Sequence, residues 1–115
     1  MKVNAKDIVG ENAISMQSGK ILYDKISKPL LSNEPVELDF SGVKIFGSPF
    51  FNVSIGLLLK DIELEELQGR LKIINLNADG NQLLNFVIKN ALKFYSMDSD
   101  KVKTLKEIIN DTDDS

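Results

Sequence analysis

The chain has 115 residues, a formal net charge of −3, and no histidine, cysteine or tryptophan. This length fits one domain. Without Cys or His, the chain cannot form a disulfide, a thiolate or imidazole zinc site, or a Ser-His-Asp triad of its own. Because proton transfer near neutral pH most often uses histidine, the composition favours a protein that is not an enzyme and that holds no cofactor.

The charge is unevenly distributed along the chain. Residues 1–97 carry 11 basic and 11 acidic side chains, whereas residues 98–115 carry three lysines against six carboxylates. The sequence therefore predicts a domain over residues 1–97 and an acidic C-terminal arm over residues 98–115, partly helical or disordered. Such an arm is either a solvated terminus or an interaction segment, and the first is the commoner case.

Composition and hydropathy also bear on partners and location. With a pI of about 4.9 and no Lys/Arg cluster, the chain lacks the basic stripe of a nucleic-acid-binding protein. The longest apolar stretch, residues 55–59, is far shorter than the ~20 residues of a membrane span. The first residues lack the apolar segment of a secretory signal. We expect a cytoplasmic protein with no membrane or nucleic-acid partner.

Taken in chain order, residues 2–15 are predicted to be extended, with a turn at Gly10 and a short strand at residues 13–14. Residues 16–31 show apolar side chains near i, i+4 spacing, which predicts a helix capped by Ser15 or Ser18. Alternation over residues 36–40 predicts a strand, and residues 43–46 continue extended after a break at residues 41–42.

In the second half of the chain, segments with the helical spacing of apolar residues again alternate with segments typical of strands. Ser48 is predicted to be an N-cap and Pro49 the first residue of a well-buried helix that ends near residue 60. Asp61 can cap a short helix over residues 63–68, which Gly69 would end. Residues 71–76 read as a buried strand, and residues 81–96 as a helix that residues 77–80 can cap.

This alternation of strands and helices predicts an α/β fold with right-handed crossovers. We expect a single domain with a mixed or parallel sheet of about four strands. Three to four helices are expected, mainly on one face of that sheet.

The middle of the chain carries a distinctive motif. A strand ending in Leu38-Asp39-Phe40, a Ser-Gly turn, a short extended piece and a serine at a helix start follow one another over residues 36–56. This arrangement resembles the STAS domain of bacterial anti-sigma factor antagonists, and more closely the STAS-like family of small bacterial proteins of unknown function. The resemblance extends over most of residues 1–97.

The resemblance implies a regulatory protein-interaction module. In anti-sigma factor antagonists, a partner that is a histidine-kinase-like ATPase phosphorylates a serine at this helix start, and Ser48 is the position that matches. Gly47 stands where those proteins have an acidic residue, and Pro49-Phe50 where they have Ser/Thr-Gly. The surface that the resemblance implies for partner binding comprises Ser41, Gly42, Lys44, Gly47, Pro49 and Asn52.

Structural explanations remain open for the same residues. Ser48 can serve only as a helix cap, Phe46, Phe50 and Phe51 can pack in the core, and Asp39 can cap a turn. A domain of this kind could also be a non-switching adaptor or a self-associating scaffold, for which a homodimer is expected.

Overall fold

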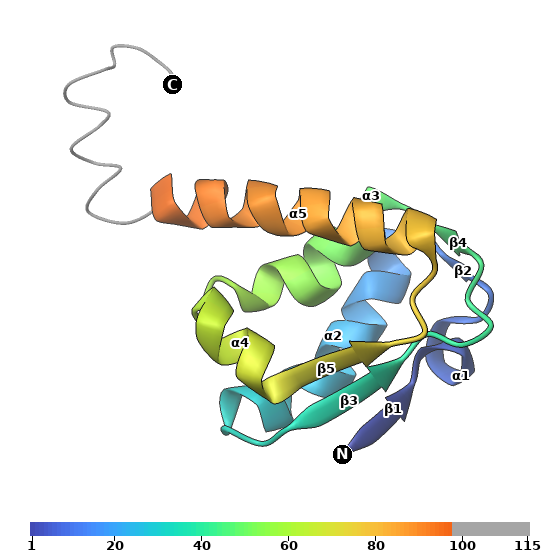
Figure 1. Ribbon diagram of the computed structural model, residues 1–115, viewed down its shortest axis with the longest axis horizontal. Helices are drawn as coiled ribbons and strands as arrows, with labels where there is room; N and C mark the ends of the chain where they lie inside the picture. Colours follow the sequence, from blue (N-terminus) through green and yellow to red (C-terminus); the bar gives the residue numbers. More distant parts are fainter. Residues whose placement is uncertain (98–115) are drawn as a thin grey trace, which may run out of the picture.

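The computed structural model describes residues 1–97, and the predicted C-terminal arm, residues 98–115, lies outside them. Three short parallel strands form the main sheet in the order β1-β3-β5. They are β1 (Lys2–Asn4), β3 (Val36–Asp39) and β5 (Leu71–Ile74). A second parallel pair, β2 (Asn12–Ala13) and β4 (Ile45–Phe46), lies beside it (Figure 1). The parallel α/β architecture is confirmed, but the described strands form a sheet of three and a sheet of two.

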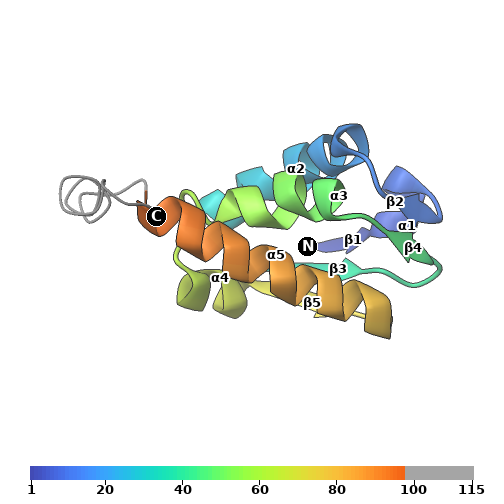
Figure 2. The same cartoon turned by 90° about the horizontal axis from the view of Figure 1, so that it is seen from above.

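The side chains of the main sheet separate cleanly between its two faces. In register, Val3 pairs with Leu38, and both are buried, whereas the neighbouring row of Lys2, Glu37 and Lys72 lies on the other face. Lys2 and Glu37 form an ion pair of 3.6 Å across that face. Helices α2, α3 and α5 all lie on the side of the buried row (Figures 1 and 2), which confirms helices mainly on one face.

The helices connect the strands and supply most of the core. They are α1 (Ala5–Val9), α2 (Met16–Leu31), α3 (Ser48–Phe51), the π-helical segment η1 (Asn52–Gly56), α4 (Leu64–Arg70) and α5 (Ala78–Met97). Among these, no helix combines the length and the apolar character that crossing a membrane requires.

Helix α2 is the element that the sequence predicts best. It spans the predicted residues 16–31, and the hydroxyl of Ser15 accepts a 3.1 Å hydrogen bond from the Ser18 backbone N–H, as an N-cap does. Its buried side is formed by Gly19, Leu22, Ile26 and Leu30. Ile21 precedes the buried Leu22 in this helix but is itself 54% exposed.

The N-terminal prediction is wrong over residues 5–9, which form helix α1 instead of extended chain. The physical reason is local, because Ala5, Ile8 and Val9 stand at i, i+3 and i+4 and turn one apolar side toward the core. Gly10, with φ of +81°, then ends the helix while its N–H bonds the Lys6 carbonyl oxygen at 2.8 Å.

The predicted helix over residues 49–60 is also corrected. Gly47 takes the N-cap position without a side-chain bond, and Ser48 is the first helical residue, so Ser48 is not the N-cap. The helix then widens into η1, where the buried hydroxyl of Ser54 donates a 2.8 Å hydrogen bond to the Phe50 carbonyl oxygen. Its predicted burial is confirmed, since Phe50, Phe51 and Leu58 have no exposed surface.

The ends of the later elements differ from prediction in three places. Helix α4 begins after Glu63, not after a cap at Asp61, and continues through Gly69 to Arg70. Strand β5 ends at Ile74 because Asn75 adopts a left-handed φ of +58°. Helix α5 begins at Ala78, and Asn77 caps it by accepting a 2.7 Å hydrogen bond from the Gly80 N–H.

An aromatic cluster joins the residue after β3, the end of β4 and helix α3 in the core. The ring of Phe40 makes edge-on contacts with Phe46, Phe50 and Phe51, at centroid distances of 5.6 to 6.5 Å. Phe46 stacks on Phe51 with an interplanar angle of 7°. The core-packing interpretation of Phe46, Phe50 and Phe51 is therefore confirmed, although Phe46 stays partly accessible.

Candidate functional site

The segment of residues 41–52 begins with a tight turn at the carboxyl end of β3. The Val43 N–H bonds the Phe40 carbonyl oxygen at 3.0 Å, and Gly42 takes the third position with φ of +84°. A type II turn needs this conformation there, which glycine adopts without strain. A Cβ atom at Gly42 would also lie 2.7 Å from the Lys6 side chain.

Asp39 organises this turn through a single carboxylate oxygen. Its Oδ1 accepts hydrogen bonds from the Ser41 N–H and the Ser41 hydroxyl, both at 2.8 Å, and from the Asn75 side-chain amide at 3.1 Å. These bonds, with that from Asn75 the largest contribution, lower the pKa of Asp39 from its ordinary value. The prediction that Asp39 caps a turn is confirmed.

The middle of the segment is fixed by backbone pairing with β2. The Glu11 carbonyl oxygen accepts from the Lys44 N–H at 2.8 Å, and the Ala13 carbonyl oxygen accepts from the Gly47 N–H at 2.9 Å. From the other side, the Asn77 side-chain amide donates to the Lys44 carbonyl oxygen at 3.2 Å. Residues 44–47, which lead to Ser48, are therefore hydrogen-bonded to the segment around β2 on one side and to Asn77 on the other.

Gly47 is required by close packing. A Cβ atom at this position would lie 2.8 Å from Ile14 Cγ2, 3.0 Å from the Ile14 carbonyl oxygen and 3.1 Å from Ile14 Cα. The acidic residue that antagonists have at this position would not fit against this β2 end. Gly47 is half-buried, so among the predicted partner-binding residues it serves packing first.

The remaining predicted site residues are mostly accessible at the surface. Ser41, Gly42, Lys44, Pro49 and Asn52 are exposed, and Ser48 is half-buried. Within the described part of the chain, the Ser48 hydroxyl has no hydrogen-bond partner. Most of the predicted surface is therefore accessible, and within residues 1–97 the hydroxyl of Ser48 takes part in no hydrogen bond.

Sequence reasoning missed a set of exposed apolar side chains near this surface. Ile14 and Met16 are 43% and 62% exposed, and Ile21 and Ile45 are each 54% exposed. Ile14 packs beside Gly47, while Met16 and Ile21 line a shallow groove with Gln17, Lys20 and Val53. We call Ile14, Met16, Ile21 and Ile45 the apolar rim. In the sequence these residues look like core positions, and only their exposure distinguishes them.

The comparison with known protein families gives one match. A family model described as a STAS-like domain of unknown function matches residues 18–81, which is more than half of the chain. The chain belongs to this family. No curated protein and no solved structure matches it. The matched span of the STAS-like domain runs from α2 into α5 and includes all of residues 41–52.

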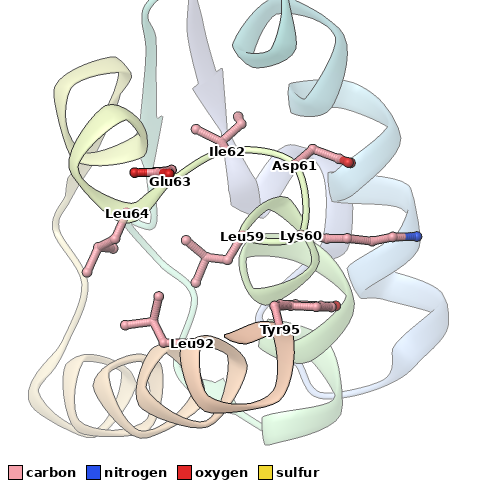
Figure 3. Close-up of a pocket in the computed structure, with 8 residues that line it drawn as sticks. All are labelled: Leu59, Lys60, Asp61, Ile62, Glu63, Leu64, Leu92 and Tyr95. Carbon is pink, nitrogen blue, oxygen red and sulfur yellow. The ribbon is translucent and has the colours of Figure 1, made fainter. Parts of the chain in front are cut away.

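A second hollow of about 470 Å³ lies at the other end of the STAS-like domain, between the 59–64 segment and the C-terminal half of α5. Leu59 and Leu92 point toward one another in it, while the Lys60 side chain points away (Figure 3). Ile62, Leu64 and Tyr95 also line this hollow, together with Asp61 and Glu63.

Within residues 1–97, no three acidic side chains lie close enough to hold a metal ion.

Proposed function

We propose that this STAS-like domain is a non-enzymatic, cytoplasmic protein-interaction module that presents residues 41–52 and the start of α3 to a protein partner. The observation that carries the proposal is the apolar rim. It puts large exposed apolar side chains beside a polar segment that backbone hydrogen bonds hold in place. Interfaces commonly combine an apolar centre with such polar surroundings. Ile14, Ile45 and Met16 would supply the contact area, and Asn52 and Lys44 the polar edge.

We further propose that the partner is a histidine-kinase-like ATPase and that Ser48 is the phosphoacceptor. The Ser48 hydroxyl oxygen would attack the γ-phosphorus of ATP, release ADP, and lose its proton to solvent or to a base of the partner. The phosphate would add about −1.5 to −2 charges beside the apolar rim. Because an apolar interface would have to desolvate this charge, the modified protein would bind more weakly.

The alternative is a non-switching adaptor or a self-associating scaffold, which would use the same rim without modification. The exposed ring of Pro49 favours this alternative, because anti-sigma factor antagonists have a serine or threonine at this position beside the phosphoacceptor. In this case the rim would bind either a second protein or a second copy, and Ser48 would serve only the fold.

The rim is tested by titration calorimetry with a purified histidine-kinase-like ATPase of the anti-sigma factor type from the same organism. The double variant Met16→Asp with Ile21→Lys should weaken binding at least about tenfold, since it places charges where contact is made. The matched control is Leu31→Lys, because Leu31 is 47% exposed on the same helix but lies at its other end. Equal affinity for the rim variant and the control would contradict the proposal.

The switch is tested separately by intact mass after incubation with the same ATPase and ATP. The wild-type protein should gain one phosphate, and Ser48→Ala should gain none, whereas Ser41→Ala should still be modified. Ser48→Asp should weaken binding if a switch operates. Unchanged binding of Ser48→Asp together with no mass gain would leave the adaptor as the function.

A further inference from the structure

Helix α5 has a shallow hollow near its start. Asp79, Gln82, Leu83 and Phe86 line this hollow, whose volume is about 440 Å³. They stand at positions i, i+3, i+4 and i+7, so they surround one point on the surface of the helix. Four side chains arranged in this way form the kind of hole that accepts one side chain of a facing helix. We call it the α5 hollow.

The side of α5 that carries the hollow is open. The helix lies on the outside of the described chain (Figures 1 and 2), and Asp79 and Gln82 are exposed. Phe86 is 58% exposed, although an aromatic ring contributes most to a contact when it is buried. The α5 hollow and an exposed ring thus lie on the same helix. Such self-complementarity is what a contact between two identical copies requires.

The charges of α5 are separated along its length. Asp79, in the first turn, is the one acidic residue of this helix, whereas Lys89 and Lys93 stand in its second half. All three side chains are exposed, and within residues 1–97 none forms an ion pair. A parallel pair of such helices would put like charges side by side, while an antiparallel pair puts the acidic start of each helix against the basic half of the other. The charges therefore favour an antiparallel second copy as the occupant.

We propose that two copies of this chain associate through α5 in antiparallel orientation, with Phe86 of each copy in the α5 hollow of the other. This arrangement places Phe86 level with Gln82 of the second copy, and the two phenylalanine rings meet beside the two-fold axis. Because each residue advances a helix by about 1.5 Å, the same register brings Lys89 level with Asp79 of the second copy. Two-fold symmetry repeats this contact, so the interface holds two pairs of opposite charge.

The contact is small, since each copy supplies one side of one helix and only residues 78–90 of the two helices overlap. Stable interfaces of standard size bury about 1,600 Å² in total. We therefore expect a weak dimer, with a dissociation constant in the micromolar range. The contact does not use the apolar rim, so it is independent of the proposed function.

Sedimentation equilibrium of the full chain, from about 5 to 500 µM, measures the association. The wild-type protein should approach twice the monomer mass at the upper end of this range. Phe86→Asp should remain monomeric, because it places a charge in the α5 hollow of the other copy. The matched control is Leu31→Asp, since Leu31 is 47% exposed at the end of α2, and this variant should still form the dimer. A wild-type protein that stays monomeric, or a Phe86→Asp variant that associates normally, would overturn the proposal.

Exchanging the two charges tests the register. Asp79→Lys alone and Lys89→Asp alone should each weaken association at least about tenfold, because like charges then meet at both contacts. An equimolar mixture of these two variants should associate as the wild type does, since every charge contact of the mixed dimer again joins opposite charges. Recovery in the mixture also shows that both variants are folded. A mixture that stays monomeric, or single variants with unchanged association, would contradict the antiparallel register.

A rim variant separates this contact from self-association through the apolar rim. Met16→Asp with Ile21→Lys changes two exposed residues of α2 and leaves α5 intact, so it should form the dimer with unchanged affinity. If this variant is monomeric while Phe86→Asp still associates, the two copies meet through the rim and the inference is wrong.

Discussion

The side-chain amide of Asn75 donates a 3.1 Å hydrogen bond to the carboxylate of Asp39, joining the ends of two neighbouring parallel strands. Asp39 closes the turn that leads into the candidate surface, and Asn75 is the residue at which β5 stops. The pair therefore couples the start of the 41–52 segment to the loop that enters α5.

Asp39 should make the stability of the domain depend on pH. Its pKa is lowered in the folded protein, chiefly by the bond from Asn75, so the ionised form is favoured by folding. That contribution is present above the ordinary value of 3.8 and is lost as pH falls through the lower folded-state pKa. The stability advantage of wild type over Asp39→Asn should therefore shrink between pH ~6 and pH ~2.

Urea unfolding of the two proteins in parallel measures this difference, because all other carboxylates are common to both. A difference that stays constant, or that grows in acid, would show that Asp39 does not ionise more easily in the folded state.

Asn75 should contribute through its backbone as well as through its side chain. Its φ of +58° costs an ordinary residue roughly 1–2 kcal/mol, whereas glycine adopts it freely. Asn75→Ala should therefore destabilise the domain more than Asn75→Gly does, although both remove the bond to Asp39. Thermal unfolding of both variants measures the gap, and equal losses would place the whole effect in the hydrogen bond.

Gly19 should tolerate no side chain, because α2 crosses the next helix at that point. A Cβ atom there would lie 2.5 Å from the Phe50 carbonyl oxygen and 2.4 Å from Val53 Cγ2. Gly19→Ala should lower the free energy of unfolding by roughly 1–3 kcal/mol despite the better helix propensity of alanine.

Gly69→Ala is the matched control, since Gly69 also lies within a helix and has open space around it. This substitution should stabilise the domain by roughly 0.5–1 kcal/mol. If both alanine variants change stability in the same direction, the close crossing of α2 and α3 does not determine the choice of glycine.

The two serines at helix starts should differ in their effect on stability. Ser15 caps α2 through its hydroxyl, so Ser15→Ala should cost about 1 kcal/mol. Ser48 makes no such bond, so Ser48→Ala should change the melting temperature little. A large loss at Ser48 would reveal a structural role and would disqualify this variant as a clean probe of phosphorylation.

The parts of the fold that sequence predicts are those that local pattern determines. Helix α2 has 16 residues, a capping serine and a regular apolar side, so it needs no knowledge of its neighbours. Helix α1 has five residues, too few for its period to be distinguished from that of an extended chain. The strands β2 and β4 have two residues each and depend on pairing between Glu11 and Lys44, which are far apart in sequence.

The candidate surface shows the same division. The motif around Ser48 was visible because its turn, proline and strand end follow one another along the chain. The apolar rim was not, because Ile14 and Ile21 have the residue types and spacing of core positions. Their exposure follows from the way α2 turns only Gly19, Leu22, Ile26 and Leu30 inward, which is decided by packing against other elements.

The π-helical segment η1 is the place where this helix holds an extra residue. It separates Phe50 and Phe51 from Leu58, and all three face the same core with no exposed surface. A π-helical turn closes through i→i+5 hydrogen bonds, so it takes one residue more than an α-helical turn does. Removing one residue from 52–56 would therefore let the segment close as an α-helix, with the phenylalanines and the leucine still facing inward. The same deletion within the regular helix α2 would instead rotate the buried side chains on its two sides apart by about 100°.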